Sequence, residues 1–190
     1  MLKMTPVYYQ EKVVPELMKE LGLSHQMAVP RLKKIVVNMG VIDPQDPKAR
    51  RTALENIAAQ FAAITGQKAN ITKAKKSISS FKLRAGDPLG VVVTLRGQRM
   101  WTFFQKLVAV ALPRVKDFRG VSRTAFDGHG NYSMGLEEQI IFPEIEYDTI
   151  ERVRSLQVVF VTSASTDASA LRLLELLGMP FAQIETKKGK

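Results

Sequence analysis

The amino-acid sequence predicts an α+β fold, in which a largely antiparallel sheet carries helices on one face and leaves a polar face open. Segments that alternate between apolar and polar residues, as strands do, are mixed with segments of helical periodicity. The two kinds do not alternate regularly, which argues against a parallel α/β sheet. A chain of 190 residues, 45% of them hydrophobic, is long enough for one substantial core. We therefore expect a single domain over residues 1–181 and a frayed tail at 182–190.

Four helices are expected from their periodicity and end signals. The first two each open with a capping residue and a proline, and each is followed by a glycine. The third places large apolar residues at helical spacing and is stopped by a proline. The expected helices are 6–21, with a bend at Pro15, then 47–65, 98–112 and 166–178.

Strands are expected at 31–39, 68–72, 89–97, 136–142 and 156–162, with an irregular arm at 113–135. In the first strand one side carries Arg31, Lys33, Ile35, Val37 and Met39, and the other carries Leu32, Lys34, Val36 and Asn38. In the strand at 89–97 one side carries Val91, Val93 and Leu95, and the other carries Val92, Thr94 and Arg96. If helices cover the more apolar sides, the remaining side chains form an open face.

The net charge of +10 is concentrated in one third of the chain. Residues 67–120 carry a net +10, whereas the preceding residues carry +3 and the following ones −3. A concentrated field of one sign usually exists to meet an opposite field, and nucleic acid is the obvious polyanion. An anionic lipid surface is the alternative, but neither a lipidation motif nor a basic amphipathic helix supports it.

Composition also excludes several classes of protein. The chain has no cysteine and only two histidines, so disulfides, thiolate zinc sites and cysteine nucleophiles are absent. No apolar run approaches the roughly 18 residues of a membrane helix, and the first residues lack the apolar segment of a signal peptide. We expect a cytoplasmic protein without metal or cofactor.

The basic loop, residues 73–88, combines cations with serines and one phenylalanine. The cations are Lys73, Lys75, Lys76, Lys82 and Arg84, and they surround Ser77, Ser79, Ser80 and Phe81. Lysine and arginine supply charge, serine hydroxyls donate to phosphate oxygens, and an aromatic ring stacks on a base. This mixture is typical of a finger that reaches into folded RNA. The alternative is a disordered, solvated loop with Phe81 folded back on the core.

The open face of the predicted sheet is a second candidate for RNA binding. Asn38, Thr94 and Arg96 stand on it with Lys34 beside them. An amide, a hydroxyl and a guanidinium on a flat sheet can bond phosphate, 2′-hydroxyl groups and base edges. A sheet face that is exposed to solvent and binds nothing explains these polar residues equally well.

Catalysis finds little support. Asp127, His129 and Asn131 lie close together in the sequence, but no nucleophile accompanies them and no catalytic or nucleotide-binding motif occurs. The six carboxylates of the acidic segment at 137–151 would repel RNA, so they face either solvent or a basic protein. They are Glu137, Glu138, Glu144, Glu146, Asp148 and Glu151. A free RNA chaperone or regulator remains a second non-enzymatic alternative.

Nine blocks of sequence resemble a known family in the family's own order. They are IVVNMG (35–40), ITGQK (64–68), ITKAKKSI (71–78), FKLRAGDPLG (81–90), VTLRG (93–97), ALPRVKDFRG (111–120), FDGHGNYSMG (126–135), EQIIFPEI (138–145) and LLELLGMPF (173–181). The family is that of the bacterial-type 5S-rRNA-binding proteins of the large ribosomal subunit, number five in the universal nomenclature. The likeness covers nearly the whole chain.

This resemblance implies a place in the central protuberance, where the protein holds 5S rRNA and touches the large rRNA. By position, the family's 5S-rRNA contacts fall on Asn38, Gln67, Thr94 and Arg96. The loop that reaches peptidyl-site tRNA falls on 75–83. The resemblance also implies a contact with a small-subunit head protein. The family commonly has arginine where this chain has His129.

Overall fold

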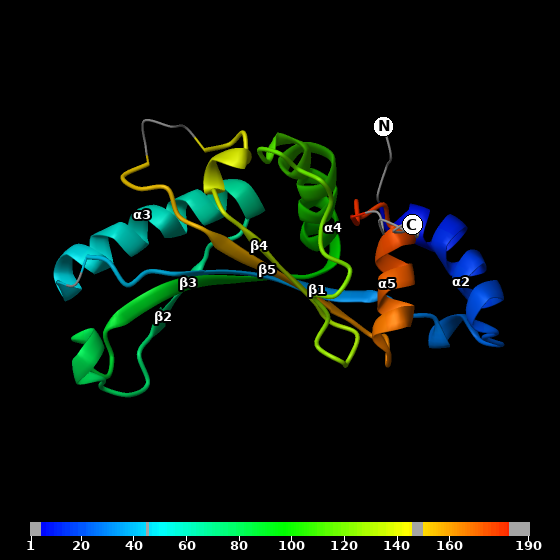
Figure 1. Cartoon of the computed structure of the whole chain (residues 1–190), viewed down its shortest axis with the longest axis horizontal. Helices are drawn as coiled ribbons and strands as arrows, with labels where there is room; N and C mark the ends of the chain where they lie inside the picture. Colours follow the sequence, from blue (N-terminus) through cyan, green and yellow to red (C-terminus); the bar gives the residue numbers. More distant parts are fainter. Residues whose placement is uncertain (1–4, 45, 146–149, 183–190) are drawn as a thin grey trace, which may run out of the picture.

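A five-stranded antiparallel sheet, in the order β2-β3-β1-β5-β4, forms the centre of the computed structural model (Figure 1). The structure describes residues 5–44, 46–145 and 150–182. The strands are β1 (Leu32–Gly40), β2 (Asn70–Lys73), β3 (Pro88–Leu95), β4 (Tyr132–Leu136) and β5 (Leu156–Thr162). Helices α3 (Pro47–Thr65) and α4 (Gly97–Lys106) cover one face and leave the other open. The predicted α+β architecture is confirmed.

β1 lies at the centre because it pairs with both β3 and β5. Ile35, Val37 and Met39 are buried under the helices, whereas Val36 and Asn38 alternate onto the opposite face, as predicted. The prediction is wrong at the start of the strand, where Leu32 is buried on the side of Ile35. A register shift between Leu32 and Lys34 inserts one residue and changes the phase of the alternation.

The prediction of a strand at 136–142 is wrong. β4 lies at Tyr132–Leu136 and ends where the predicted strand begins, and Gln139–Ile141 forms a 3-10 turn instead. Tyr132, Met134 and Leu136 alternate with Ser133 and Gly135, so the period of a strand is present in the sequence. The glycines and polar residues before Tyr132 made this segment resemble a loop. Pairing with β5 overrides that local preference.

The expected helices all form. α3 is capped by Asp46, whose Oδ2 accepts from the backbone N–H of Ala49 at 3.2 Å, and it ends at a left-handed Gly66. α5 (Asp167–Leu176) is capped by Thr166. The first helix comprises α1 (Pro6–Tyr8), a π-helical turn (Tyr9–Val13) and α2 (Val14–Leu21). The wide turn precedes Pro15, which cannot donate the hydrogen bond of a regular α-helix.

α4 continues through a π-helical turn (Leu107–Ala111) and a 3-10 turn (Leu112–Arg114). Its apolar side chains form the middle of the core, and Phe104 meets Phe160 of β5 edge to face at 5.8 Å between ring centroids. Phe103 is also buried and stacks on Phe142. No helix in the described ranges is both long and apolar enough to cross a membrane.

Arg172 of α5 joins the first helix to the rest of the chain. Its Nε donates to Glu20 Oε2 at 2.6 Å and its Nη2 to Glu20 Oε1 at 2.5 Å, a two-pronged contact, and Nη1 donates to Glu175. These hydrogen bonds raise the pKa of the Arg172 guanidinium further above its ordinary value. Figure 1 shows α2 and α5 side by side at one end of the sheet. Glu175 also pairs with Arg123.

The irregular arm predicted at 113–135 is shorter in the structure, because a 3-10 turn and β4 take its two ends. The remaining arm, residues 115–131, returns from α4 to β4 along the edge of the sheet. Val121 donates to the carbonyl of Pro180 at 2.8 Å, and Ala182 donates back to Val121 at 2.9 Å. The hydroxyl of the fully buried Tyr132 donates to the carbonyl of Ser122 at 2.7 Å. Burial raises the pKa of Tyr132 to about 12. One side chain thus fastens the arm to β4.

Replacing Tyr132 with phenylalanine removes only this hydroxyl. We expect the free energy of unfolding to fall by about 0.5–1.5 kcal/mol, the usual contribution of one hydrogen bond. Urea denaturation measures the change, and trypsin should cut faster at Arg114, Lys116 and Arg119, which are exposed in or next to the arm. Tyr8→Phe is the matched control, because the Tyr8 hydroxyl makes no hydrogen bond within the described residues. Equal trypsin sensitivity of the two variants would contradict the role of Tyr132.

Candidate nucleic-acid interface

The open face of the sheet carries two of the predicted RNA-binding residues next to each other. Asn38 is paired with Val92, and Thr94 is paired with Val36, so both side chains alternate onto the face without helices. Both are half-buried. Figure 1 shows α3 and α4 on the opposite side of the sheet, so that these two helices leave this face uncovered. The alternation of the sequence therefore placed these two side chains correctly.

Gln67, Arg96 and Lys34 surround this pair in different ways. The amide of Gln67 donates through Nε2 to the carbonyl of Thr94 at 3.1 Å, so Gln67 is held beside Thr94 with its Oε1 remaining as an acceptor. Arg96 lies just beyond the end of β3, at the N-cap of α4, and is exposed at the rim. Lys34 is half-buried and pairs with Val161 of β5.

This face carries three further polar residues that were not predicted from the sequence. Asn70, Val92, Asn38, Gln157 and Gly135 are successive partners across all five strands, so Asn70 and Gln157 share the row of Asn38. Ser133 pairs with Val159 and so shares the row of Thr94 and Val36. The alternation of residues 156–162 was sufficient to predict Gln157 on this face. Ser133 could not be predicted, because the strand that contains it was expected at 136–142.

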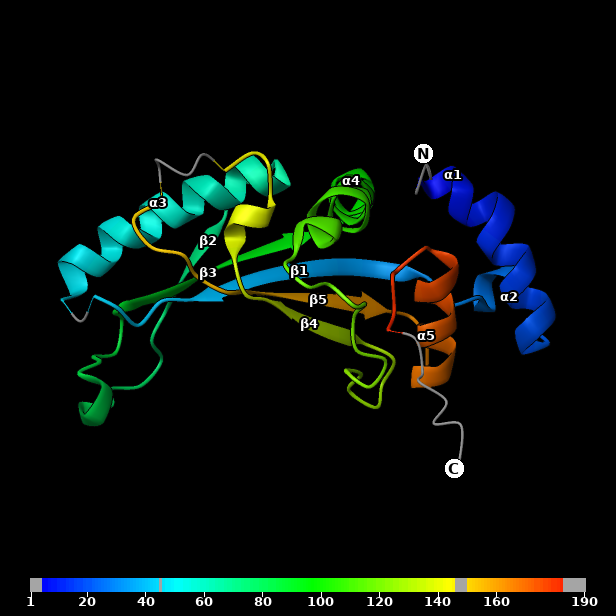
Figure 2. The same ribbon diagram turned by 45° about the horizontal axis from the view of Figure 1, so that its top comes forward.

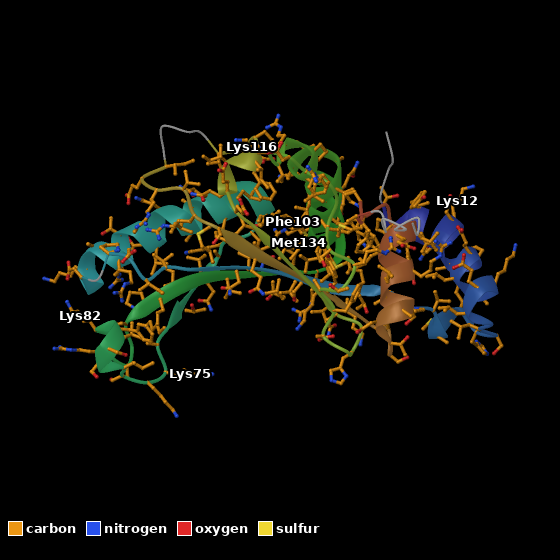
Figure 3. The ribbon with its side chains drawn as sticks, viewed as in Figure 1. Lys12, Lys75, Lys82, Phe103, Lys116 and Met134 are labelled. Carbon is orange, nitrogen blue, oxygen red and sulfur yellow. The ribbon has the colours of Figure 1, made fainter. Side chains whose placement is uncertain are left out.

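The basic loop is held by its own backbone. Ala74 donates to the carbonyl of Asp87, Gly86 donates to that of Ala74, and Ile78 and Leu83 exchange hydrogen bonds of 3.0 and 3.1 Å. A 3-10 turn (Ser79–Phe81) forms the tip. Figure 1 shows the loop projecting from the open side of the sheet, and Figure 3 shows Lys75 and Lys82 pointing outward from it.

Phe81 is 60% exposed, so the alternative in which its ring folds back on the core is wrong. Within the described residues none of the five cations of the loop forms an ion pair with a carboxylate. Asp87, the only acid of the loop, accepts instead from the backbone N–H of Arg84 at 2.8 Å. The loop therefore presents an aromatic ring and uncompensated positive charge to solvent.

A glycine loop, residues 126–131, projects from the same side of the sheet (Figure 1). Asp127 Oδ1 accepts from the N–H groups of His129 and Asn131, and Asp127 Oδ2 accepts from the Asn131 side chain at 2.7 Å. Asp167, at the start of α5, accepts from Gly128 and Gly130. These contacts occupy both carboxylates and leave the His129 side chain exposed. The Asp, His and Asn of this loop are thus parts of a rigid turn.

The acidic segment is partly tied to the helices. Glu144 pairs with Lys106 Nζ at 2.6 Å, and that ammonium also donates to the carbonyl of Ile64 at 2.8 Å. Glu151 accepts from the Asn56 side chain. Glu137 and Glu138 are exposed, and Glu146 and Asp148 lie outside the described residues. The described part of the segment lies on the helical side, away from the basic loop (Figure 2).

Other potential sites are not supported. In the ranges that the structure describes, no group of three or more His, Asp or Glu side chains is arranged to hold a metal ion. His25 is exposed at a turn, where its carbonyl accepts from the N–H of Ala28. A hollow of about 590 Å³ between α3 and α4 is lined by Arg96, Arg99 and Lys106, which extends the basic surface past the rim of the sheet.

An open polar sheet face and an uncompensated basic loop are typical of a nucleic-acid-binding protein. Comparison with known proteins agrees with this class. Residues 25–84 match the family model described as "Ribosomal protein L5", and residues 88–181 match the model that describes the C-terminus of this ribosomal family. The chain is 58% identical over 175 residues to the large ribosomal subunit protein uL5 of Chloroflexus aggregans, covering 92% of this chain and 94% of that protein.

A second relative is the large ribosomal subunit protein uL5 of Symbiobacterium thermophilum. It is 54% identical over 176 residues, which cover 92% of this chain and 96% of that protein. The chain belongs to the ribosomal protein L5 family. It is a structural, non-enzymatic constituent of the large ribosomal subunit, as the sequence predicted.

The geometry of the glycine loop predicts a dependence on pH. Hydrogen bonds from the Asn131 side chain and from the N–H groups of Asn131 and His129 lower the pKa of Asp127 from 3.8 to about 2. The pKa of Asp127 is lower in the folded protein than in the unfolded chain, so the ionised carboxylate stabilises the folded state. This stabilisation is complete above pH 3.8 and is lost as the pH falls toward about 2. The protection of the His129 and Asn131 amides against hydrogen exchange should fall over this interval.

Asp127→Ala should abolish that pH dependence and leave both amides poorly protected throughout. Glu137→Gln is the control, since Glu137 is exposed and makes no hydrogen bond or ion pair within the described part of the chain. Protection that is unchanged by Asp127→Ala would show that the carboxylate does not hold the loop.

Proposed function

We propose that the protein binds 5S rRNA through the open face of its sheet and helps attach it to the large rRNA in the central protuberance. The observation that carries this proposal is the cluster formed by Asn38, Thr94 and Gln67 on a face that no helix covers. Half-buried amide and hydroxyl groups on a fixed backbone suit recognition of RNA by shape, 2′-hydroxyl groups and base edges. Arg96 and Lys34 supply positive charge at the margin for the phosphates.

The basic loop makes a second, different contact in this proposal. Lys75 and Lys82 project away from the sheet and Phe81 is exposed, which suits a charge-led and transient contact with peptidyl-site tRNA. The residues assigned to it are Lys73, Lys75, Lys76, Ser77, Ser79, Ser80, Phe81, Lys82 and Arg84. The acidic segment, on the other side of the sheet, suits a basic protein such as one of the small-subunit head.

The primary test is a titration of the purified protein against 5S rRNA and a scrambled RNA of equal length at two salt concentrations. Specific recognition predicts a preference of roughly a thousandfold or more for 5S rRNA that survives at the higher salt concentration. Equal affinities with a steep salt dependence would favour a general RNA chaperone instead.

Alanine substitutions test the sheet contact directly. Asn38→Ala or Thr94→Ala should weaken 5S rRNA binding by about 1–3 kcal/mol, because each leaves a hydrogen-bonding group of the RNA without its partner. Thr52→Ala is the control, since Thr52 is exposed on α3 on the helical side of the sheet. Unchanged affinity of the Asn38, Thr94 double variant would refute the assignment of this face.

Neutralising the loop tests the second contact. Replacing Lys75, Lys76 and Lys82 with glutamine should leave 5S rRNA affinity nearly intact and speed dissociation of peptidyl-site tRNA from ribosomes that carry the variant. A triple variant with the same charge change at Lys12, Lys19 and Lys48, which are exposed elsewhere, is the control. Loss of 5S rRNA binding in the loop variant would contradict the division into two contacts.

A further inference from the structure

A shallow hollow lies on the open face where β1 ends, β5 begins and β4 ends. Its volume is about 390 Å³, toward the small end of the range for ligand pockets, roughly 300–1,000 Å³. The residues whose positions alternate onto the open face here are Asn38, Gly40, Ser133, Gly135, Ser155 and Gln157. The hollow lies beside the Asn38 and Thr94 pair but is displaced toward the β4 edge of the sheet.

Nothing within the chain requires glycine at two positions of this hollow. Neither Gly40 nor Gly135 has a positive φ, and a Cβ atom added at either would meet no atom within 4 Å. Every other glycine in the described ranges either has a positive φ or, like Gly90, would bring a Cβ to 2.7 Å from a backbone oxygen. Glycine weakens a strand, and in a strand it often marks the close approach of a ligand or another backbone.

The chemistry of the lining favours an uncharged ligand. The residues around the hollow include no lysine, arginine, aspartate or glutamate. Asn38 and Gln157 are cross-strand partners and present two amides side by side, with Ser133 and Ser155 nearby. Within the described part of the chain these four side chains make no hydrogen bonds to other groups. A phosphate would need cations here, whereas a nucleobase needs paired donors and acceptors.

We propose that this hollow receives one unpaired adenine base of the bound RNA, lying on the bare backbone of Gly40 and Gly135 with its Watson–Crick edge, the amino group and N1, bonded to Asn38 and Gln157. An amide offers the adjacent acceptor and donor that match the amino group and ring nitrogen of adenine, whereas guanine is matched by arginine or lysine. Proteins that recognise RNA by sequence commonly take up unstacked bases in this way. The proposal rests on the proposed binding of 5S rRNA to this face.

The test is a dimethyl sulfate footprint of a 5S rRNA transcript with the full-length protein, alongside an affinity titration. The reagent methylates the exposed N1 of adenine and N3 of cytosine. The wild-type protein should protect at least one unpaired adenine. Gly135→Val, which fills the floor, and Gln157→Met, which removes an amide without changing charge, should each restore methylation of that adenine. Each should also weaken binding about tenfold, which lies within the discrimination of one bidentate contact.

Matched controls keep the outcome clear. Gln105→Met on α4 and Ala59→Val on α3 make similar changes on the helical side and should bind like wild type. Valine favours strands, so the unfolding temperature of Gly135→Val should match that of wild type. If Gly135→Val is less stable, the binding and footprint of Gln157→Met decide the test. If both variants bind and protect like wild type while Thr94→Ala still binds 5S rRNA more weakly, the proposed adenine site is refuted and the proposed function stands. Protection of a cytosine alone would overturn the choice of adenine, and wild type without preference for 5S rRNA would overturn both proposals.

Discussion

The pairing of β1 with both β3 and β5 is the constraint on which the rest of the structure depends. Ile35, Val37 and Met39 must lie under the helices, and this requirement sets the register of the central strand. Because side chains alternate, the same register places Asn38 on the open face, and a slip of one residue would exchange the two sets. Burial on one side therefore determines which polar groups an RNA can reach on the other.

The two loops beside the open face are stiffened by their own polar groups. In the glycine loop, Asp127 and Asp167 accept four backbone N–H groups between them, and in the basic loop Asp87 accepts from the N–H of Arg84. Carboxylates used in this way order the backbone without pairing with neighbouring cations. The basic loop thus keeps both a defined shape and its full positive charge, which favours contact with a polyanion.

The basic loop and the described part of the acidic segment lie on opposite sides of the sheet (Figure 1). Lys106 pairs with Glu144 and also holds the carbonyl of Ile64, so one ammonium joins α3, α4 and the acidic segment on the helical side. Lys75 and Lys82 of the basic loop face the open side (Figure 3). Such a separation keeps the proposed RNA contact and the proposed contact with a basic protein on different surfaces, so that the two fields do not cancel.

Local periodicity and end signals were enough to predict the helices, four of the five strands, and the placement of Asn38 and Thr94. Tertiary contacts set the bulge that buries Leu32, the position of β4, and the row that joins Asn70, Asn38 and Gln157. They also bring Gly40 and Gly135 together beside one hollow. Strand order and register join residues that are distant in the sequence, such as Asn38 and Gln157, and no local pattern in a single sequence encodes that pairing.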